Sequence, residues 1–294
     1  MIDTDAALTF LDFVLERHRV WEKRQAGLPQ PWTEDPVLAT RKFTNVFRFL
    51  DPGSQFVIQH LLHEDPEQTL ARCFLYRHTN LPSAWMAYAV EHGSMPDVLG
   101  GLDFLEEFWM DYKADGGKVF SGAYMIYPQS SVPGTDKVTS IIDLTRRLFV
   151  SGSRVRHDFM NARSQTERFA ALRTNRGVAD FMSMQILTDF GYGTEFREDD
   201  FVVPGPGAIK GAAALGLKGP EAIEWGCLTL SEEPPLVPAD DYGEHYLTPS
   251  RMDVQNCLCE FSKYVRFASK PSPQKLYPPA HPGVQLKPVL PPQW

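Results

Sequence analysis

A glycine-rich segment in the second half of the chain places the strongest constraint on its local fold. Residues 203–213 read Val-Pro-Gly-Pro-Gly-Ala-Ile-Lys-Gly-Ala-Ala. The glycines permit a tight turn, and the residues that follow favour a helix that opens directly after it. In a hairpin between two helices, main-chain N–H groups at the start of the second helix bind a phosphate. We therefore predict that Gly205, Gly207, Lys210 and Gly211 contact the backbone of DNA, although an ordinary helix–helix turn has the same pattern.

The same segment does not fit the common nucleotide-binding loops. A P-loop requires Lys-Ser or Lys-Thr after its last glycine, and here Lys210 is followed by Gly211. A dinucleotide fingerprint requires a ribose-binding acid after a strand–helix–strand unit, and none follows. The chain therefore carries no P-loop kinase signature.

Charge is distributed unevenly along the 294 residues, whose net charge is −8. The window 143–180 has a charge of +4 with only arginine as its cation, which leaves −12 for the rest. Arginine pairs with phosphate through two parallel hydrogen bonds, so the window is a candidate for phosphate contacts. A solvated helix face explains the same composition equally well. The overall acidity excludes a protein that coats DNA by charge alone.

Apolar spacing and Asp-Pro pairs predict a mainly α fold. We expect helices at 6–23, 36–50, 52–62, 66–78, 82–92, 96–113, 137–148, 161–172, 178–190 and 248–267. Residues 118–126 are expected to be extended, and 218–250 to form a long loop or insertion. Residues 1–268 are predicted to be one helical domain, which can consist of two lobes, followed by a proline-rich tail at 269–294.

The segment around Asn45 combines amide and guanidinium groups with large apolar residues. On the expected 36–50 helix, Arg41, Asn45 and Arg48 would share one side. Apolar neighbours surround these groups and Gln55, and amides recognise base edges through paired hydrogen bonds. We predict a substrate-binding role for these residues and for Asp51, although Arg48 and Asp51 can instead pair with each other.

Two further groups of polar residues are candidates. Gln185 and Asp189 lie one helical turn apart among apolar residues, with Tyr192 next, and can bind a base edge or simply a main-chain N–H. Asp253 opens the helix that follows the glycine-rich segment. Glu260 and Lys263 share a face of that helix and can supply a general base and a phosphate contact, or form a surface salt bridge.

Several other chemistries lack support in the sequence. The four cysteines, of which only Cys257 and Cys259 are close, do not form a zinc pattern and indicate structural thiols in a reducing compartment. No Gly-x-Ser-x-Gly motif is present. No dedicated metal site is predicted, while Mg²⁺ held by one carboxylate and substrate phosphates is compatible with the sequence. We see no signal peptide and no membrane-spanning run, so a cytoplasmic location is expected.

These motifs together resemble a phage family, the alpha-glutamyl/putrescinyl thymine pyrophosphorylases, also called amino acid:DNA transferases. Related helical domains carry the label of 5-hydroxymethyluracil DNA kinase. The resemblance covers about residues 40–267 and is carried by 43–56, the Gln185–Tyr192 segment, the glycine-rich hairpin and Asp253–Tyr264. It implies a helix-hairpin-helix fold similar to that of DNA glycosylases, with long loops.

The resemblance also implies a reaction. An amine, from an amino acid or a polyamine, would displace pyrophosphate from 5-(pyrophosphoryloxymethyl)uracil in DNA. Asp253 or Glu260 would then be the carboxylate that accepts a proton, while Arg41, Arg48 and Lys263 would stabilise the departing pyrophosphate. Asn45, Gln55 and Gln185 would hold a base that has left the stack. A DNA-base kinase of the same pathway is the expected protein partner.

Two alternatives remain open. A glycosylase-like enzyme that cleaves a modified base would use the same aspartate, but no lysine nucleophile is evident near the hairpin. A non-catalytic subunit that presents DNA to a kinase would need only the DNA contacts. Neither the nucleophile nor the oligomeric state follows from the sequence.

Overall fold

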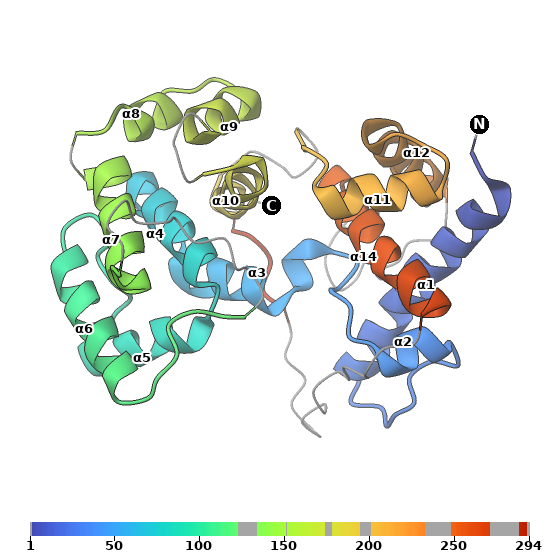
Figure 1. Ribbon diagram of the computed structural model, residues 1–294, viewed down its shortest axis with the longest axis horizontal. Coiled ribbons are helices and arrows are strands. Elements are labelled where there is room, and N and C mark those ends of the chain that lie inside the picture. The colour runs from blue at the N-terminus through green and yellow to red at the C-terminus, as the bar shows by residue number, and fades with distance from the viewer. Residues whose placement is uncertain are drawn as a thin grey trace. The chain divides into compact units, whose positions relative to one another are not determined.

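A computed structural model describes residues 2–122, 134–150, 152–173, 178–194, 201–232, 248–270 and 288–292. Among these residues the regular structure is helical and contains no strand, which confirms the prediction of a mainly α fold (Figure 1). The chain divides into two compact units. Unit 1 comprises Met1–Asp51 and Glu198–Leu290, and unit 2 comprises Pro52–Arg197 and Pro291–Trp294.

Unit 1 is built around one long C-terminal helix. Its elements are α1 (Thr4–Gln25), α2 (Pro36–Thr40), the 3₁₀ turn η1 (Arg48–Leu50), α11 (Pro206–Ala214), α12 (Gly219–Glu232) and α14 (Arg251–Ser269). Helix α14 packs against all five of the others. It begins with a capping box, in which Ser250 and Asp253 satisfy each other's main-chain N–H groups. This cap fixes the start of α14, and with it the position of the polar residues that follow.

Unit 2 is a bundle of short helices. Its elements are α3 (Pro52–Phe56), the π-helical turn η2 (Val57–Leu61), α4 (Pro66–Thr79), α5 (Pro82–His92), α6 (Leu102–Ala114), α7 (Lys137–Thr145), the π-helical turn η3 (Arg146–Val150), α8 (Arg154–Met160), α9 (Gln165–Arg173) and α10 (Asp180–Gly191). Helix α4 is buried along most of its length and packs against α7 and α10. As Asp65-Pro66 predicts, Asp65 caps α4 and Pro66 occupies its first turn.

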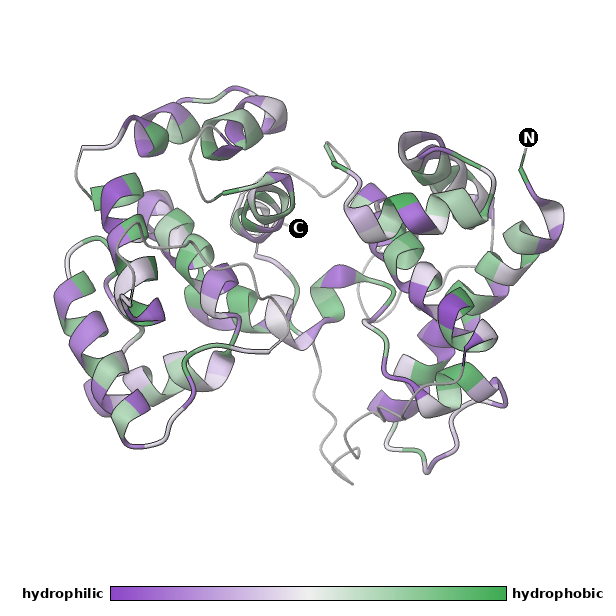
Figure 2. Ribbon diagram, viewed as in Figure 1, coloured by the Kyte–Doolittle hydropathy of each residue, from purple (hydrophilic) through white to green (hydrophobic). Residues whose placement is uncertain are grey.

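Hydropathy along the ribbons agrees with this packing. Helices of both units carry hydrophilic and hydrophobic residues in alternation (Figure 2). In α14 the buried positions include Val254, Cys257, Leu258 and Phe261, which recur at three- and four-residue spacing. The same spacing, used above to predict helices, therefore marks the faces that form the core.

Three local predictions need correction. The helix expected at 36–50 ends at Thr40, because the chain is extended at Arg41 and the side chain of Asn45 bonds the carbonyl of Leu50 instead of continuing the helix. The segment 218–250, expected to be a loop, contains α12, whose buried residues Ala222, Ile223, Gly226 and Leu230 form a helical stripe. The described part of the expected extended piece, 118–122, forms no strand, and 123–126 lie outside the described residues.

Two glycines allow α11 and α14 to approach closely. A Cβ added at Gly211 would overlap the main-chain carbonyl of Leu258, and one added at Gly207 would overlap the thiol of Cys259. Gly207 and Gly211 are one turn apart and therefore lie on the same face of α11. That face is in contact with α14, so these glycines have a packing role.

We expect Gly211→Ala to lower the free energy of unfolding by about 3 kcal/mol, because the new methyl group meets main-chain atoms that cannot rotate away. Gly207→Ala is the matched control, since its clash is with a side-chain sulfur. Combining it with Cys259→Ala is expected to restore stability, whereas no side-chain truncation is expected to rescue Gly211→Ala. Urea denaturation of the four proteins measures these differences, and a wild-type-like Gly211→Ala would contradict the close approach.

Candidate active site

A cluster of charged side chains lies inside unit 1. Four of its members, Arg17, Arg48, Asp253 and Glu260, are at most 4% exposed. Asp51 and Lys263 complete the group, which we call the carboxylate cluster and which is drawn from α1, η1 and α14. Buried charges require partners, so each carboxylate of the cluster must be accounted for.

Asp253 is fully engaged in holding the backbone. One carboxylate oxygen accepts a hydrogen bond from the main-chain N–H of Arg48 at 2.6 Å. The other accepts from the main-chain N–H of Ser250 and from its hydroxyl, both at 2.9 Å. These bonds tie η1 to the start of α14, which gives Asp253 a clear structural role. Its predicted catalytic role stays a prediction.

Asp51 follows η1 and differs from Asp253 in its surroundings. Its carboxylate accepts one hydrogen bond from the main-chain N–H of Asn45 at 2.9 Å. Burial raises the pKa of this carboxyl to about 6, against the lowering effects of the Asn45 N–H, Arg48 and Arg17, while Glu260 adds to the rise. A carboxyl that titrates near neutral pH suits a general base, because it is both ionised and basic at the working pH.

Glu260 and Lys263 form an ion pair on α14. The ammonium nitrogen of Lys263 lies 2.6 Å from Oε1 of Glu260. The Glu260 side chain is 5% exposed and that of Lys263 is 43% exposed, so the pair reaches from the cluster to the surface. A half-exposed lysine at the rim is suited to meet an anionic ligand.

The remaining predicted residues of unit 1 lie around this helix. Arg41 is buried, with its guanidinium 4.5 Å from the ring centre of Phe267 on α14. The N–H of Gly205 donates to the side-chain oxygen of Gln255 at 3.2 Å, so it is already used within the fold. Lys210 is exposed on α11. DNA contacts by the glycine-rich segment stay a prediction, with Lys210 the residue best placed to make one.

Four predicted substrate-binding residues belong to unit 2. Asp189 and Tyr192 are fully buried, Gln185 is 3% exposed, and Gln55 is partly exposed. Asp189 forms a two-point ion pair with Arg77 of α4. The hydroxyl of Tyr192 donates to that of Ser54 at 3.4 Å. Their substrate contacts stay predictions, while the contacts of Asp189 and Tyr192 hold α10 against α3 and α4.

Most of the arginine-rich window is paired within unit 2. Arg146 contacts Asp103, Glu106 and Asp143, and Arg154, Arg156 and Arg173 each contact one carboxylate. The guanidinium of Arg168 lies between 5 and 6 Å from two phenylalanine ring centres. These contacts fit the alternative explanation of the window, a salt-bridged helix surface.

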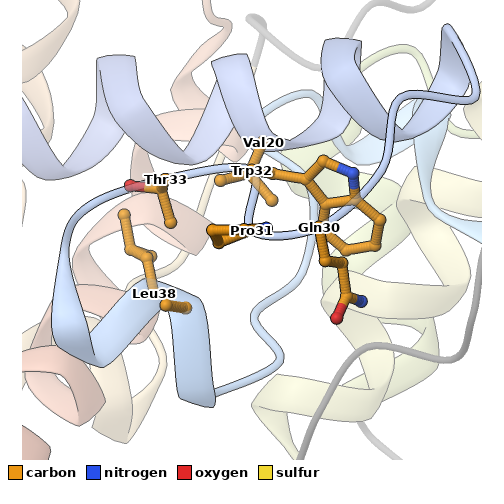
Figure 3. Close-up of a pocket in the computed structure, with 7 residues that line it drawn as sticks. Val20, Gln30, Pro31, Trp32, Thr33 and Leu38 are labelled. Carbon is orange, nitrogen blue, oxygen red and sulfur yellow. The ribbon is translucent and has the colours of Figure 1, made fainter.

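Unit 1 also contains a pocket of about 270 Å³. It is lined by Val20, Gln30, Pro31, Trp32, Thr33, Leu38 and Ala39, and Figure 3 shows the Trp32 ring and the Gln30 amide beside each other in its wall. None of these residues belongs to the carboxylate cluster. Among the described residues no group of three or more metal-ligating side chains occurs, and no helix has the length and apolar character needed to cross a bilayer.

Sequence reasoning missed two arginines. Arg17 donates from Nη2 to the thiol of Cys257, 240 residues away, and Arg77 pairs with Asp189, 112 residues away. Both sit on helices whose local sequence is ordinary. Only the burial of an arginine inside a helical stripe, at a position expected to be apolar, could have marked them.

Comparison with known proteins identifies the relatives of this chain. The model of the family described as 5-hmdU DNA kinase, helical domain, matches residues 4–273. A 5-hmdU DNA kinase of Bacillus phage SP10 is 26% identical over 228 residues, which are 67% of this chain and 34% of that protein. The chain thus spans about a third of the length of this relative. No solved structure matches.

Proposed function

Since the chain belongs to the family of 5-hmdU DNA kinase helical domains, we propose that it acts on bases derived from 5-hydroxymethyluracil in DNA. The proposed reaction is the displacement of pyrophosphate from 5-(pyrophosphoryloxymethyl)uracil by an amine. The observation that carries this proposal is the Asp51 carboxyl, whose pKa burial raises to about 6 beside Arg48 and Glu260. Amines are protonated at neutral pH, so the reaction needs such a base.

The chemistry balances with the groups of the cluster. Asp51 takes one proton from the ammonium form of the nucleophile. The free amine nitrogen forms a bond to the 5-methylene carbon, the bond from that carbon to oxygen breaks, and pyrophosphate leaves with the electron pair. The second proton on nitrogen passes to solvent. Because Asp253 already accepts three hydrogen bonds, we assign proton transfer to Asp51 and not to Asp253.

Cations at the rim complete the proposal. Lys263, with its half-exposed ammonium group, would stabilise the developing charge on the pyrophosphate, and bound Mg²⁺ would add to this effect. Lys210 on α11 would contact the DNA backbone. We keep Asn45 as a candidate for holding the base, although its side chain also bonds the carbonyl of Leu50.

A second candidate function follows from the length of the relative. The chain spans about a third of the phage 5-hmdU DNA kinase that it matches, and its sequence has no P-loop. A helical domain that binds the hydroxymethyl base and presents it to a separate phosphorylating domain would explain both facts.

Mass spectrometry of nucleosides distinguishes these functions. DNA that contains 5-(pyrophosphoryloxymethyl)uracil is incubated with the protein, Mg²⁺ and a pool of amino acids and polyamines, then digested. A thymidine adduct whose mass identifies the amine is the expected result, and DNA with unmodified 5-hydroxymethyluracil is the matched control. Intact DNA together with salt-dependent binding would favour the presenting domain, and abasic sites would indicate a glycosylase.

A further inference from the structure

Arg17 is a buried cation held by uncharged groups. It lies on α1, is 1% exposed, and its guanidinium carbon is 4.9 Å from the ring centre of Phe13. Its Nη2 donates to Sγ of Cys257 at 2.9 Å. Its Nε and Nη1 are buried and have no hydrogen-bond partner among the described residues. A charge in such a place is costly unless an opposite charge is near.

The thiol of Cys257 does not supply that charge. Burial raises the pKa of Cys257 to about 11, against the effect of Arg17, so the sulfur is a neutral acceptor at physiological pH. The Phe13 ring carries no net charge. These two contacts therefore orient the guanidinium without neutralising it, which leaves its field to act on the carboxylates nearby.

Those carboxylates belong to the proposed active site. Asp51 is subject to the field of Arg17 from α1, of Arg48 from η1 and of Glu260 from α14, in addition to its hydrogen bond from Asn45. Asp253 and Glu260 act together with Arg17 on Cys257, which lies between them on α14. Arg17 is thus surrounded by the acidic groups of the carboxylate cluster but bonded to a neutral one.

We propose that Arg17 is a positioning residue whose fixed charge stabilises the ionised form of the Asp51 carboxylate. Cys257 serves this role indirectly, because its sulfur holds the guanidinium in place. The inference rests on the proposed function insofar as Asp51 is the proton acceptor, but the electrostatic coupling itself can be measured without any reaction.

The test is a titration of the Asp51 carboxyl carbon by ¹³C NMR. Arg17→Met removes the charge but keeps much of the side-chain volume, and we expect the Asp51 midpoint to rise by about one pH unit. Arg17→Lys, which keeps the charge, is expected to raise it less. Arg19→Met is the matched control, since Arg19 is exposed on the same helix, and should leave the midpoint unchanged.

Cys257→Ala provides a milder variant if Arg17→Met does not fold. It removes the acceptor that fixes the guanidinium, and a rise in the Asp51 midpoint is again expected. An unchanged midpoint in a folded Arg17→Met or Cys257→Ala protein would overturn the inference. A shifted midpoint in a protein that shows no amine transfer would leave the inference standing and reject the proposed function instead. If transfer occurs, the acid limb of its pH profile should move with the NMR midpoint.

Discussion

Asp51→Asn is expected to reduce amine transfer by a factor of about 10² to 10⁴ while the protein stays folded, because it removes a proton acceptor and little else. An asparagine oxygen can still accept the hydrogen bond from the N–H of Asn45. In the wild-type protein the rate should rise with pH through about 6, as the Asp51 carboxyl loses its proton. Initial rates between pH 5 and 8 measure both effects.

The same variant should be more stable than the wild type at alkaline pH. The pKa of Asp51 rises from 3.8 in the unfolded chain to about 6 in the folded protein, so the folded state binds this proton more tightly. The free energy of unfolding therefore falls as pH increases from about 4 to above 6. Partial exposure of the side chain limits the loss to about 1 to 2 kcal/mol, which Asp51→Asn should recover at pH 8.

The combination of lower activity and higher stability is the distinguishing result. A substitution that merely damages the fold would lower both, and Asp12→Asn, at an exposed position on α1, should change neither. Wild-type transfer rates in Asp51→Asn would show that another group accepts the proton, with Glu260 the nearest candidate in the cluster. Asp253→Asn is expected to lose stability, because its carboxylate ties η1 to the start of α14.

The sequence predicts helices well where their signals are local. The Asp65-Pro66 start of α4 and the capped start of α14 are read directly from neighbouring residues. The helix expected at 36–50 failed because the bond from Asn45 to Leu50 favours a turn that spacing alone does not reveal. Helix α12 was missed because the prolines and acids beyond it dominate the composition of 218–250.

The candidate site was predicted only in part for a related reason. Asp51, Glu260 and Lys263 were singled out, and the structure places all three in the carboxylate cluster with Arg48 and Asp253. Gln55, Gln185, Asp189 and Tyr192 belong to unit 2 instead. Arg17 was not found, because its partner lies 240 residues away and no local pattern encodes such a contact. Long-range pairing of buried charges is where local sequence reasoning stops.

The second large effect is expected at the ion pair of unit 2. Arg77 and Asp189 join α4 to α10, with the Arg77 side chain 5% exposed and that of Asp189 fully buried. Removal of one partner leaves the other as an uncompensated buried charge. We therefore expect Arg77→Met or Asp189→Leu alone to lower the free energy of unfolding by about 3 to 5 kcal/mol.

The double variant Arg77→Met/Asp189→Leu should recover most of that loss, because two apolar side chains of similar size need no charge partner. Denaturant unfolding of the wild type, both single variants and the double variant gives the coupling free energy directly. Arg173→Met is the control, since its pair with Asp180 is exposed and should contribute about 0 to 1 kcal/mol. Single variants as stable as that control would contradict a structural role for the pair. A stable double variant that has lost activity would instead return Asp189 to the substrate site.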